Sequence, residues 1–151
     1  MIEGVVVTPL KRINDPRGWL VELFRVDEWP VELHPAMAYV SLTLPGVIRG
    51  PHEHHEQADL FCFVSSTFKL RLWDKRAWSA TLNAIDTYLT GEGNPLAVLV
   101  PSGVVHAYQN VGSTSGFVIN CPNRLYAGWG HAAVVDEIRH EGNPAFSMEG
   151  E

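Results

Sequence analysis

The histidines are the residues of this sequence whose types and spacing are best suited to chemistry. His52 and His54 stand two positions apart in a polar segment that runs from Arg49 to Asp59. In an extended segment, residues two apart leave the same face, so we expect both imidazoles on one side of a strand and His55 on the other. Imidazoles that converge in this way can bind a transition metal or act as a general base near neutral pH.

A second histidine motif lies further along the chain. The segment from Pro101 to Asn110 reads Pro-x-Gly-x-x-His-x-x-x-Asn, with its histidine at His106. Proline and glycine favour a tight turn, and we expect the strand after that turn to aim His106 toward His52 and His54. Either motif alone is compatible with a polar hairpin, whereas the two together predict one cavity lined by three imidazoles.

The composition is that of a globular protein and excludes several classes of function. Apolar residues make up 46% of the chain and charged residues 19%, which excludes a disordered chain. The net charge of -6 argues against nucleic-acid or anionic-membrane partners. No apolar run has the length of a membrane span, so we expect a cytoplasmic protein. Cys62 and Cys121 lie in apolar runs and are expected to be buried, reduced thiols.

Short alternating segments between turns predict an all-β fold. Residues 38–44 alternate polar and apolar side chains, and clusters of Gly, Pro and Asn recur along the chain. The expected strands are residues 5–7, 19–25, 38–44, 60–64, 68–73, 86–90, 96–100, 104–109 and 116–121. Short helical turns are expected at residues 27–33, which Pro30 weakens, and at residues 132–139. We predict a single domain over residues 1–151, built as a jelly roll or a small barrel.

The two histidine motifs, in this order, resemble the paired motifs of the cupins. His52-x-His54-x4-Asp59 corresponds to the first motif, and the segment ending at Asn110 to the second. The resemblance implies a double-stranded β-helix, the cupin jelly-roll barrel, which opens at one end onto a small-molecule or metal site.

A narrower resemblance covers most of the chain. The segments that carry it are, in order, Asp15–Trp19 with Glu22 and Phe24, Gly46–His52, Asp74–Arg76 and Pro101–His106. They are similar to the ordered motifs of the dTDP-4-dehydrorhamnose 3,5-epimerases. This resemblance implies an isomerase of deoxysugar biosynthesis that acts without a cofactor on a dTDP-4-keto-6-deoxyhexose, by proton abstraction next to the keto group. It also implies a homodimer that pairs through exchanged N-terminal strands.

The same resemblance implies roles for individual residues. His52 is the catalytic base, and His54 or Tyr108 is the proton relay; an imidazole suits this transfer when donors stabilise the enolate. The substrate-binding residues that it implies are Arg17 and Arg49 at the diphosphate, Glu22 and Phe24 near the nucleobase, His106 in the sugar pocket, and Arg76.

Several positions depart from the family pattern. Asp59 stands near the family's lysine, Ile119 near the tyrosine that serves as its acid, Tyr39 at an asparagine and His54 at a glutamine. The carboxylate that supports the base is assigned to Glu141, with Asp136 as second choice. Because of His54, the segment Arg-Gly-x-His-x-His is also similar to the dTDP-sugar 3,4-ketoisomerases, in which two histidines serve one enediol shuttle.

Two alternatives to the isomerase stay open. The first is a metal-binding cupin in which His52, His54, Asp59 and His106 surround one divalent transition metal. The second is a non-catalytic homologue that binds a sugar nucleotide, since the family's tyrosine and lysine are missing. The sequence leaves open which sugar and nucleotide bind and which residue is the general acid.

Overall fold

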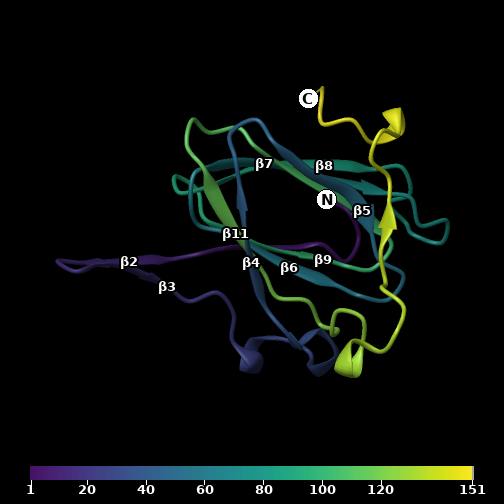
Figure 1. Ribbon diagram of the computed structural model, residues 1–151, viewed down its shortest axis with the longest axis horizontal. Helices are drawn as coiled ribbons and strands as arrows, with labels where there is room; N and C mark the ends of the chain where they lie inside the picture. The colour runs from purple at the N-terminus through teal and green to yellow at the C-terminus, as the bar shows by residue number, and fades with distance from the viewer. Residues whose placement is uncertain (151) are drawn as a thin grey trace.

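Antiparallel strands form two five-stranded sheets that face each other in the computed structural model, which describes residues 1–150 (Figure 1). The first sheet has the order β1 (Val6–Pro9), β9 (Leu96–Val100), β6 (Asp59–Phe63), β11 (Gly116–Asn120) and β4 (Tyr39–Thr43). The second has the order β12 (Ile138–Arg139), β5 (Ile48–Glu53), β10 (Val104–Asn110), β7 (Thr67–Asp74) and β8 (Ile85–Gly91). The predicted all-β cupin jelly roll is confirmed.

Short 3₁₀ turns occur outside the sheets. They are η1 (Val26–Glu28), η2 (Val31–Leu33), η3 (Trp129–His131) and η4 (Pro144–Phe146). Pro30 separates the first two, as its missing N–H and fixed φ lead us to expect. A helix of membrane-spanning length and hydropathy is absent from residues 1–150.

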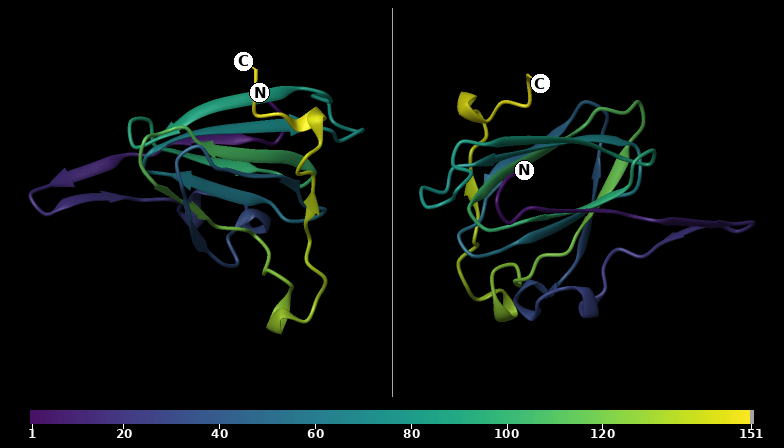
Figure 2. Two further views of the ribbon diagram at one scale, coloured as in Figure 1. Left: turned by 45° about the horizontal axis from the view of Figure 1, so that its top comes forward. Right: turned by 180° about the vertical axis from the view of Figure 1, so that it is seen from behind.

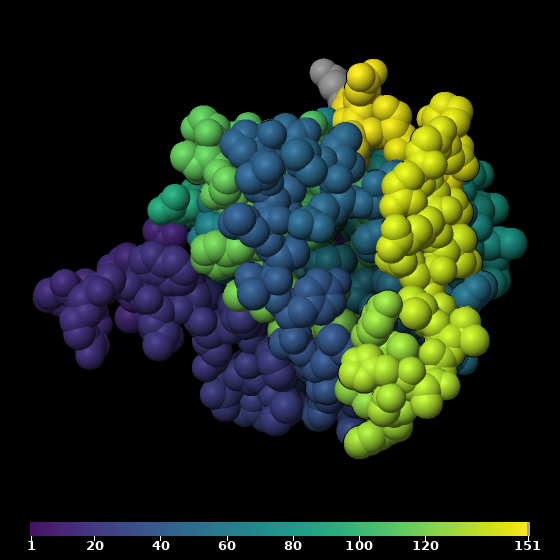
Figure 3. All heavy atoms as spheres, in the orientation of Figure 1, coloured from purple at the N-terminus to yellow at the C-terminus, as the bar shows by residue number. Residues whose placement is uncertain are grey.

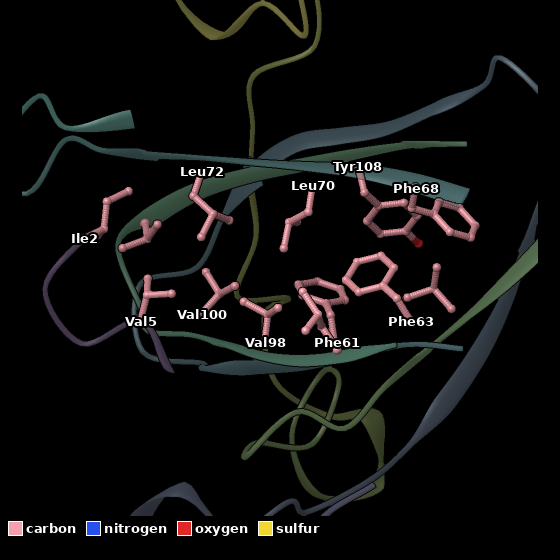
Figure 4. Close-up of a cluster of buried hydrophobic side chains, with 13 residues drawn as sticks. Ile2, Val5, Phe61, Phe63, Phe68, Leu70, Leu72, Val98, Val100 and Tyr108 are labelled. Carbon is pink, nitrogen blue, oxygen red and sulfur yellow. The ribbon is translucent and has the colours of Figure 1, made fainter. Parts of the chain in front are cut away.

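The hydrophobic core fills the space between the sheets (Figure 4). Leu70, Leu72 and Tyr108 of the second sheet face Val98 and Phe61 of the first, and all five are buried. Side chains from the two inner faces pack as in a β-sandwich. Beyond Phe61 the core gives way to polar residues, since the ring centroids of Phe61 and His106 are 5.3 Å apart.

Strands β6 and β9 are buried on both faces, which explains their continuous apolar runs. Their outer face carries Cys62 and Leu99, which the segment after β3 covers with Phe24 and Trp29. Cys62 and Cys121 are free thiols, as predicted.

Two segments differ from the sequence-based expectation. The strand expected over residues 19–25 is shorter, because β3 (Gly18–Val21) ends where the chain turns back to cover β6 and β9. The helical turn expected over residues 132–139 is wrong: Ile138 and Arg139 form β12, which pairs with Glu53 and His52 of β5. Backbone pairing with a neighbouring strand outweighs the weak local preference for a helix.

The hairpin of β2 (Arg12–Asp15) and β3 projects away from the two sheets (Figure 2; purple in Figure 3). Its strands pair only with each other among the described residues. The Arg12 guanidinium lies 4.8 Å from the Trp19 ring centroid, and Arg17 at the tip bonds Asp15. An isolated two-stranded hairpin is marginally stable in water.

The C-terminal segment crosses the outer face of the second sheet (yellow in Figures 1 and 3). Phe146 and Met148 pack there on Trp73 and Val105, and the Lys69 ammonium donates to the Met148 carbonyl. This packing fixes β12 beside β5 and thereby brings the residues just before β12 to the histidines.

Candidate active site

Three imidazoles meet between β5 and β10, at the point where the hydrophobic core ends. His52 and His106 are partners in the register of these strands, and their ring centroids lie 4.4 Å apart. The His54 ring lies 5.7 Å from each of the other two. The structure therefore brings together the histidines of the two sequence motifs.

Gly50 permits this close approach of the two strands. Its φ is +90°, and a Cβ there would lie 2.7 Å from the His106 carbonyl oxygen. A side chain at this position would push β5 away from β10 and would separate His52 from His106.

Asp59 lies beneath the histidines, at the start of β6. Its Oδ2 is 2.9 Å from His54 Nε2 and 3.4 Å from His106 Nε2, and Asp59 is 1% exposed. Its Oδ1 accepts hydrogen bonds from Gln57 and Asn120. Burial alone would raise the pKa of Asp59, but the His106 and His54 imidazoles beside the carboxylate outweigh it and hold the pKa well below its usual range.

His54 is the imidazole that these contacts favour in the charged form. Its Nδ1 faces the Asp136 carbonyl oxygen, which can only accept a hydrogen bond, and its Nε2 faces the Asp59 carboxylate. Burial opposes the charge, but Asp59 and the Asp136 carbonyl outweigh it and raise the pKa of His54. A charged His54 next to a charged Asp59 forms a buried ion pair.

His52 is neutral for the complementary reason. Burial, followed by the proximity of His106 and His54, lowers the pKa of His52 to about 3. Its Nδ1 lies 4.0 Å from Glu137 Oε1. At physiological pH the His52 ring thus carries an unprotonated nitrogen, as a proton acceptor requires.

Two cavities adjoin the histidines, and His52, Tyr39 and Glu137 line both of them. The larger, of about 1010 Å³, extends from His54 to the irregular segment that carries Tyr126 and Trp129. The smaller, of about 370 Å³, runs between β4 and β5. The smaller volume lies within the range of pockets that bind small molecules, and the larger volume lies at the upper end of that range.

Arg49 and Tyr108 line the smaller cavity together with His52. The Arg49 guanidinium donates to Thr43 Oγ1 and to the Leu42 carbonyl oxygen, which fixes its direction. Tyr108 is 4% exposed, and its hydroxyl lies 2.9 Å from Ser41 Oγ. These two residues, predicted from sequence, therefore share a cavity with the histidines.

Four other predicted residues lie apart from the histidines. Arg17 stands at the tip of the projecting hairpin with 90% of its side chain exposed. Arg76 is buried in contacts with Asp74, Ser79 and the Glu3 carbonyl, and it lines none of the cavities of about 1010, 600 and 370 Å³. Glu22 and Phe24 line a separate cavity of about 600 Å³ beneath the hairpin.

The carboxylate next to His52 is Glu137, and not Glu141 or Asp136 as the sequence suggested. Asp136 instead accepts backbone hydrogen bonds from His55, Glu56 and Gln57, and so holds the loop after β5. Glu141 lines the smaller cavity near Arg139. Sequence reasoning also missed Tyr39 and Arg139 as lining residues, since neither lies in a histidine motif.

Comparison with known proteins identifies the family. A family model described as dTDP-4-dehydrorhamnose 3,5-epimerase matches residues 1–136. The chain belongs to this family. The nucleotide-sugar epimerase predicted from the motifs is thereby confirmed at the level of the family, and the enzyme is an isomerase.

Two relatives share a substantial part of the sequence. A spore coat polysaccharide biosynthesis protein of Bacillus subtilis is 41% identical over 114 residues, which are 76% of this chain and 75% of the relative. A probable low-salt glycan biosynthesis epimerase of Haloferax volcanii is 36% identical over 126 residues, which are 83% of this chain and 81% of the relative.

Solved structures share the fold. A dTDP sugar isomerase from Desulfovibrio desulfuricans superimposes with a TM-score of 0.84 at 22% identity, over 97% of this chain and 91% of that one. A 4-keto-6-deoxy sugar epimerase from Streptomyces spheroides gives 0.78 at 23% identity, over 95% and 73%.

Proposed function

We propose that the protein epimerises a dTDP-4-keto-6-deoxyhexose, with His52 as the base that removes the proton beside the keto group. The observation that carries this proposal is the position of the His52 ring, which lines both cavities next to the buried His54–Asp59 pair. A neutral imidazole can accept a proton, and the charged groups fixed around it can stabilise the negative charge that develops on the enolate.

The proton transfer begins when His52 takes the proton from the carbon next to the carbonyl. The electron pair of that C–H bond moves to the keto oxygen and gives an enolate. The resulting His52 imidazolium is stabilised by the Glu137 carboxylate, whose Oε1 lies 4.0 Å from His52 Nδ1. We expect this contact to shorten once the substrate excludes water. His54 serves as the proton relay on the enolate side, supported by its contact with Asp59.

The binding roles of the other predicted residues belong to the same proposal. Arg49 takes the diphosphate, because its side chain is held in place at the smaller cavity. His106 is 2% exposed and lines neither of the two cavities, so its support for the sugar site is its contact with the His52 ring, while its Nδ1 faces the Val104 carbonyl oxygen. Tyr108 supports this wall through Ser41. The buried Arg76 gives no comparable support for a binding role.

Proton exchange tests this proposal directly. In deuterated water, dTDP-4-keto-6-deoxyglucose is expected to gain deuterium at the carbon beside the keto group and to change configuration there. Binding without deuterium incorporation would indicate the non-catalytic sugar-nucleotide binder. Movement of the keto group from C4 to C3 would indicate a ketoisomerase.

A divalent metal site is the second candidate function, with a specific observation in its favour. The ligand atoms of His52, His54 and His106 lie within 4.8 Å of one another. The Nδ1 atoms of His54 and His106 both face backbone carbonyls, which leaves Nε2 for a ligand bond near Asp59 Oδ2. Tetrahedral ligands at 2.0–2.1 Å from zinc are about 3.4 Å apart, so the rings would have to move closer.

Metal analysis of protein purified without a histidine tag separates the two candidates. The epimerase proposal expects substoichiometric metal and activity that survives a chelator. Stoichiometric metal that is lost in a His54→Ala variant, together with activity lost in chelator, would favour the metal-binding cupin instead.

We also propose a homodimer in which the β2–β3 hairpin of one chain covers its partner. The hairpin exposes Ile13, Trp19 and Leu20 at 54%, 45% and 62%, and edge strand β4 exposes Val40 and Leu42. An exposed apolar edge needs cover. The apolar segment at residues 5–7, which we expected to need a partner, is covered by the same chain, because β1 pairs with β9. Arg17 then reaches the substrate of the partner rather than that of its own chain.

Mixed dimers test this arrangement. Arg17→Ala and His52→Asn chains, each inactive or weak alone, should recover activity when refolded together, because one of the two sites then has both residues. Absence of recovery, or a monomer by light scattering, would contradict the dimer.

The proposal places this function in one cupin domain over residues 1–151 and in the cytoplasm. The single domain is supported by β1 and β12, since each of these terminal strands completes a sheet. A reducing compartment accords with the two buried, free cysteines.

A further inference from the structure

Inversion at a carbon needs a proton donor on the face opposite to the base. A single base that removes a proton and returns it to the same face exchanges the hydrogen but leaves the configuration unchanged. Ile119, the residue near the family's tyrosine, has no acidic proton, and its side chain packs on the outer face of the first sheet with Cys62. The donor therefore has to come from elsewhere in the site.

Tyr39 occupies the wall of the site that does not carry the base. It belongs to β4 of the first sheet, whereas His52 belongs to β5 of the second. Both residues line both of the cavities next to the histidines. The two side chains thus reach the same cavities from different sheets.

The hydrogen bonding of Tyr39 leaves its own proton available. The partner of its hydroxyl among residues 1–150 is Asn120 Nδ2, which donates to the Tyr39 oxygen at 2.9 Å. The same Nδ2 donates to Asp59 Oδ1, and a carboxylate can only accept, so the amide orientation is fixed. Tyr39 thus acts as an acceptor toward Asn120 and keeps its O–H for a group in the cavity.

We infer that Tyr39 is the general acid that protonates the opposite face of the carbon deprotonated by His52. This inference rests on the proposed epimerase function. In the second half of the reaction, the enolate electron pair reforms the carbonyl and its carbon takes the proton of the Tyr39 O–H. The phenolate that remains is stabilised by the Asn120 N–H. Solvent then returns a proton to Tyr39, and His52 releases its proton to solvent.

The electrostatic surroundings support this assignment. Tyr39 is 46% exposed, but its partial burial, only partly offset by the hydrogen bond from Asn120, raises its pKa to about 12. The phenol is therefore protonated throughout the physiological range, as an acid must be before it acts. Asn120 is 1% exposed and bridges Tyr39 to Asp59, which couples the acid to the charged pair below the base.

Two other tyrosines each line one of these cavities with His52, and both fit this role less well. Tyr126 lines only the larger cavity, from an irregular segment, and is 57% exposed. Tyr108 lines only the smaller cavity. It belongs to β10, directly beside β5, so it lies on the same sheet as the base. Its hydroxyl is engaged with Ser41 and its ring is packed among Phe61, Phe63 and Phe68.

The test measures exchange and inversion separately. Wild type, Tyr39→Phe and Tyr88→Phe are incubated with dTDP-4-keto-6-deoxyglucose in deuterated water, and borohydride reduction then fixes the configuration for NMR. Tyr88 is the matched control, because its hydroxyl bonds Asp86 and lines none of the cavities. Melting temperatures of the variants report on folding.

The inference expects that Tyr39→Phe slows inversion by about 100-fold or more, within the usual range for general acid catalysis. Deuterium should still enter the sugar with retained configuration, at a rate within about tenfold of wild type. Unchanged inversion, or an equal loss of exchange and inversion in a variant that melts like wild type, would overturn the inference while leaving the epimerase proposal intact. Absence of exchange in the wild type would overturn both.

Discussion

His52 and His106 face each other across two hydrogen-bonded strands, with ring centroids 4.4 Å apart, although they come from motifs far apart in the chain. This contact places the proposed base beside a second imidazole in the wall of the cavity. Burial there disfavours the protonated form of His52. The surroundings shift two of the histidines in opposite directions: contact with Asp59 raises the pKa of His54, whereas burial lowers the pKa of His52 to about 3. The predictions below test the parts of this arrangement.

Replacement of the base should abolish the reaction. His52→Asn is expected to reduce both deuterium incorporation and epimerisation by about 100-fold to 10,000-fold, the usual contribution of a positioned base. His55→Asn is the matched control, because this neighbouring histidine is exposed and lines neither cavity next to the base. Equal rates for the two variants would exclude His52 as the base.

Removal of the buried carboxylate should destabilise the protein. Asp59→Asn leaves His54 without its partner and is expected to lower the free energy of unfolding by about 3 kcal/mol. Denaturant unfolding measures this change. Asp15→Asn is the comparison, since it breaks an exposed pair with Arg17 and should leave unfolding unchanged. A stability loss that is no larger for Asp59→Asn would show that the His54–Asp59 contact is not a charged pair.

The depressed pKa of His52 predicts a specific pH dependence of stability. The unfolded chain binds a proton at this site near pH 6.5, but the folded protein does so only near pH 3, so folding becomes less favourable as the pH falls below 6.5. The contribution of His54, whose pKa is raised, is already complete below pH 6.5 and stays constant there.

Between pH 6.5 and pH 5, the wild type should therefore lose up to about 2 kcal/mol that His52→Asn retains. Unfolding curves at both pH values give this difference. The same slope for the two proteins would mean that His52 titrates normally in the folded state.

The two arginines predicted from sequence as ligand contacts should behave differently. Arg49 lines the cavity that contains His52, so Arg49→Ala is expected to raise KM by about tenfold with little loss of stability. Arg76 is buried against Asp74, so Arg76→Ala should leave KM unchanged and destabilise the fold by about 3 kcal/mol. A higher KM for Arg76→Ala than for Arg49→Ala would reverse this assignment.

The sequence contains enough information to predict the barrel and the meeting of its histidines. Alternation and turn residues mark most strands, and the Pro-x-Gly turn sets the register of His106. Both signals are local. The antiparallel pairing of β5 with β10 then places His106 directly beside His52.

The sequence signal is weakest where long-range contacts decide the structure. Glu137 reaches His52 because β12 pairs with β5, and two adjacent residues in an irregular segment, Asp136 and Glu137, cannot be told apart by any period. Arg76 matches a family motif, yet its side chain forms a buried ion pair with Asp74. Tyr39 lies in no histidine motif, and only the fold brings it to the cavities that His52 lines.

The most direct test of the central claim is deuterium exchange by the wild-type enzyme with dTDP-4-keto-6-deoxyglucose in the presence of a chelator. The account predicts deuterium at the carbon beside the keto group, with inverted configuration, and loss of both in His52→Asn. Incorporation that persists in His52→Asn, or that requires added metal, would contradict it.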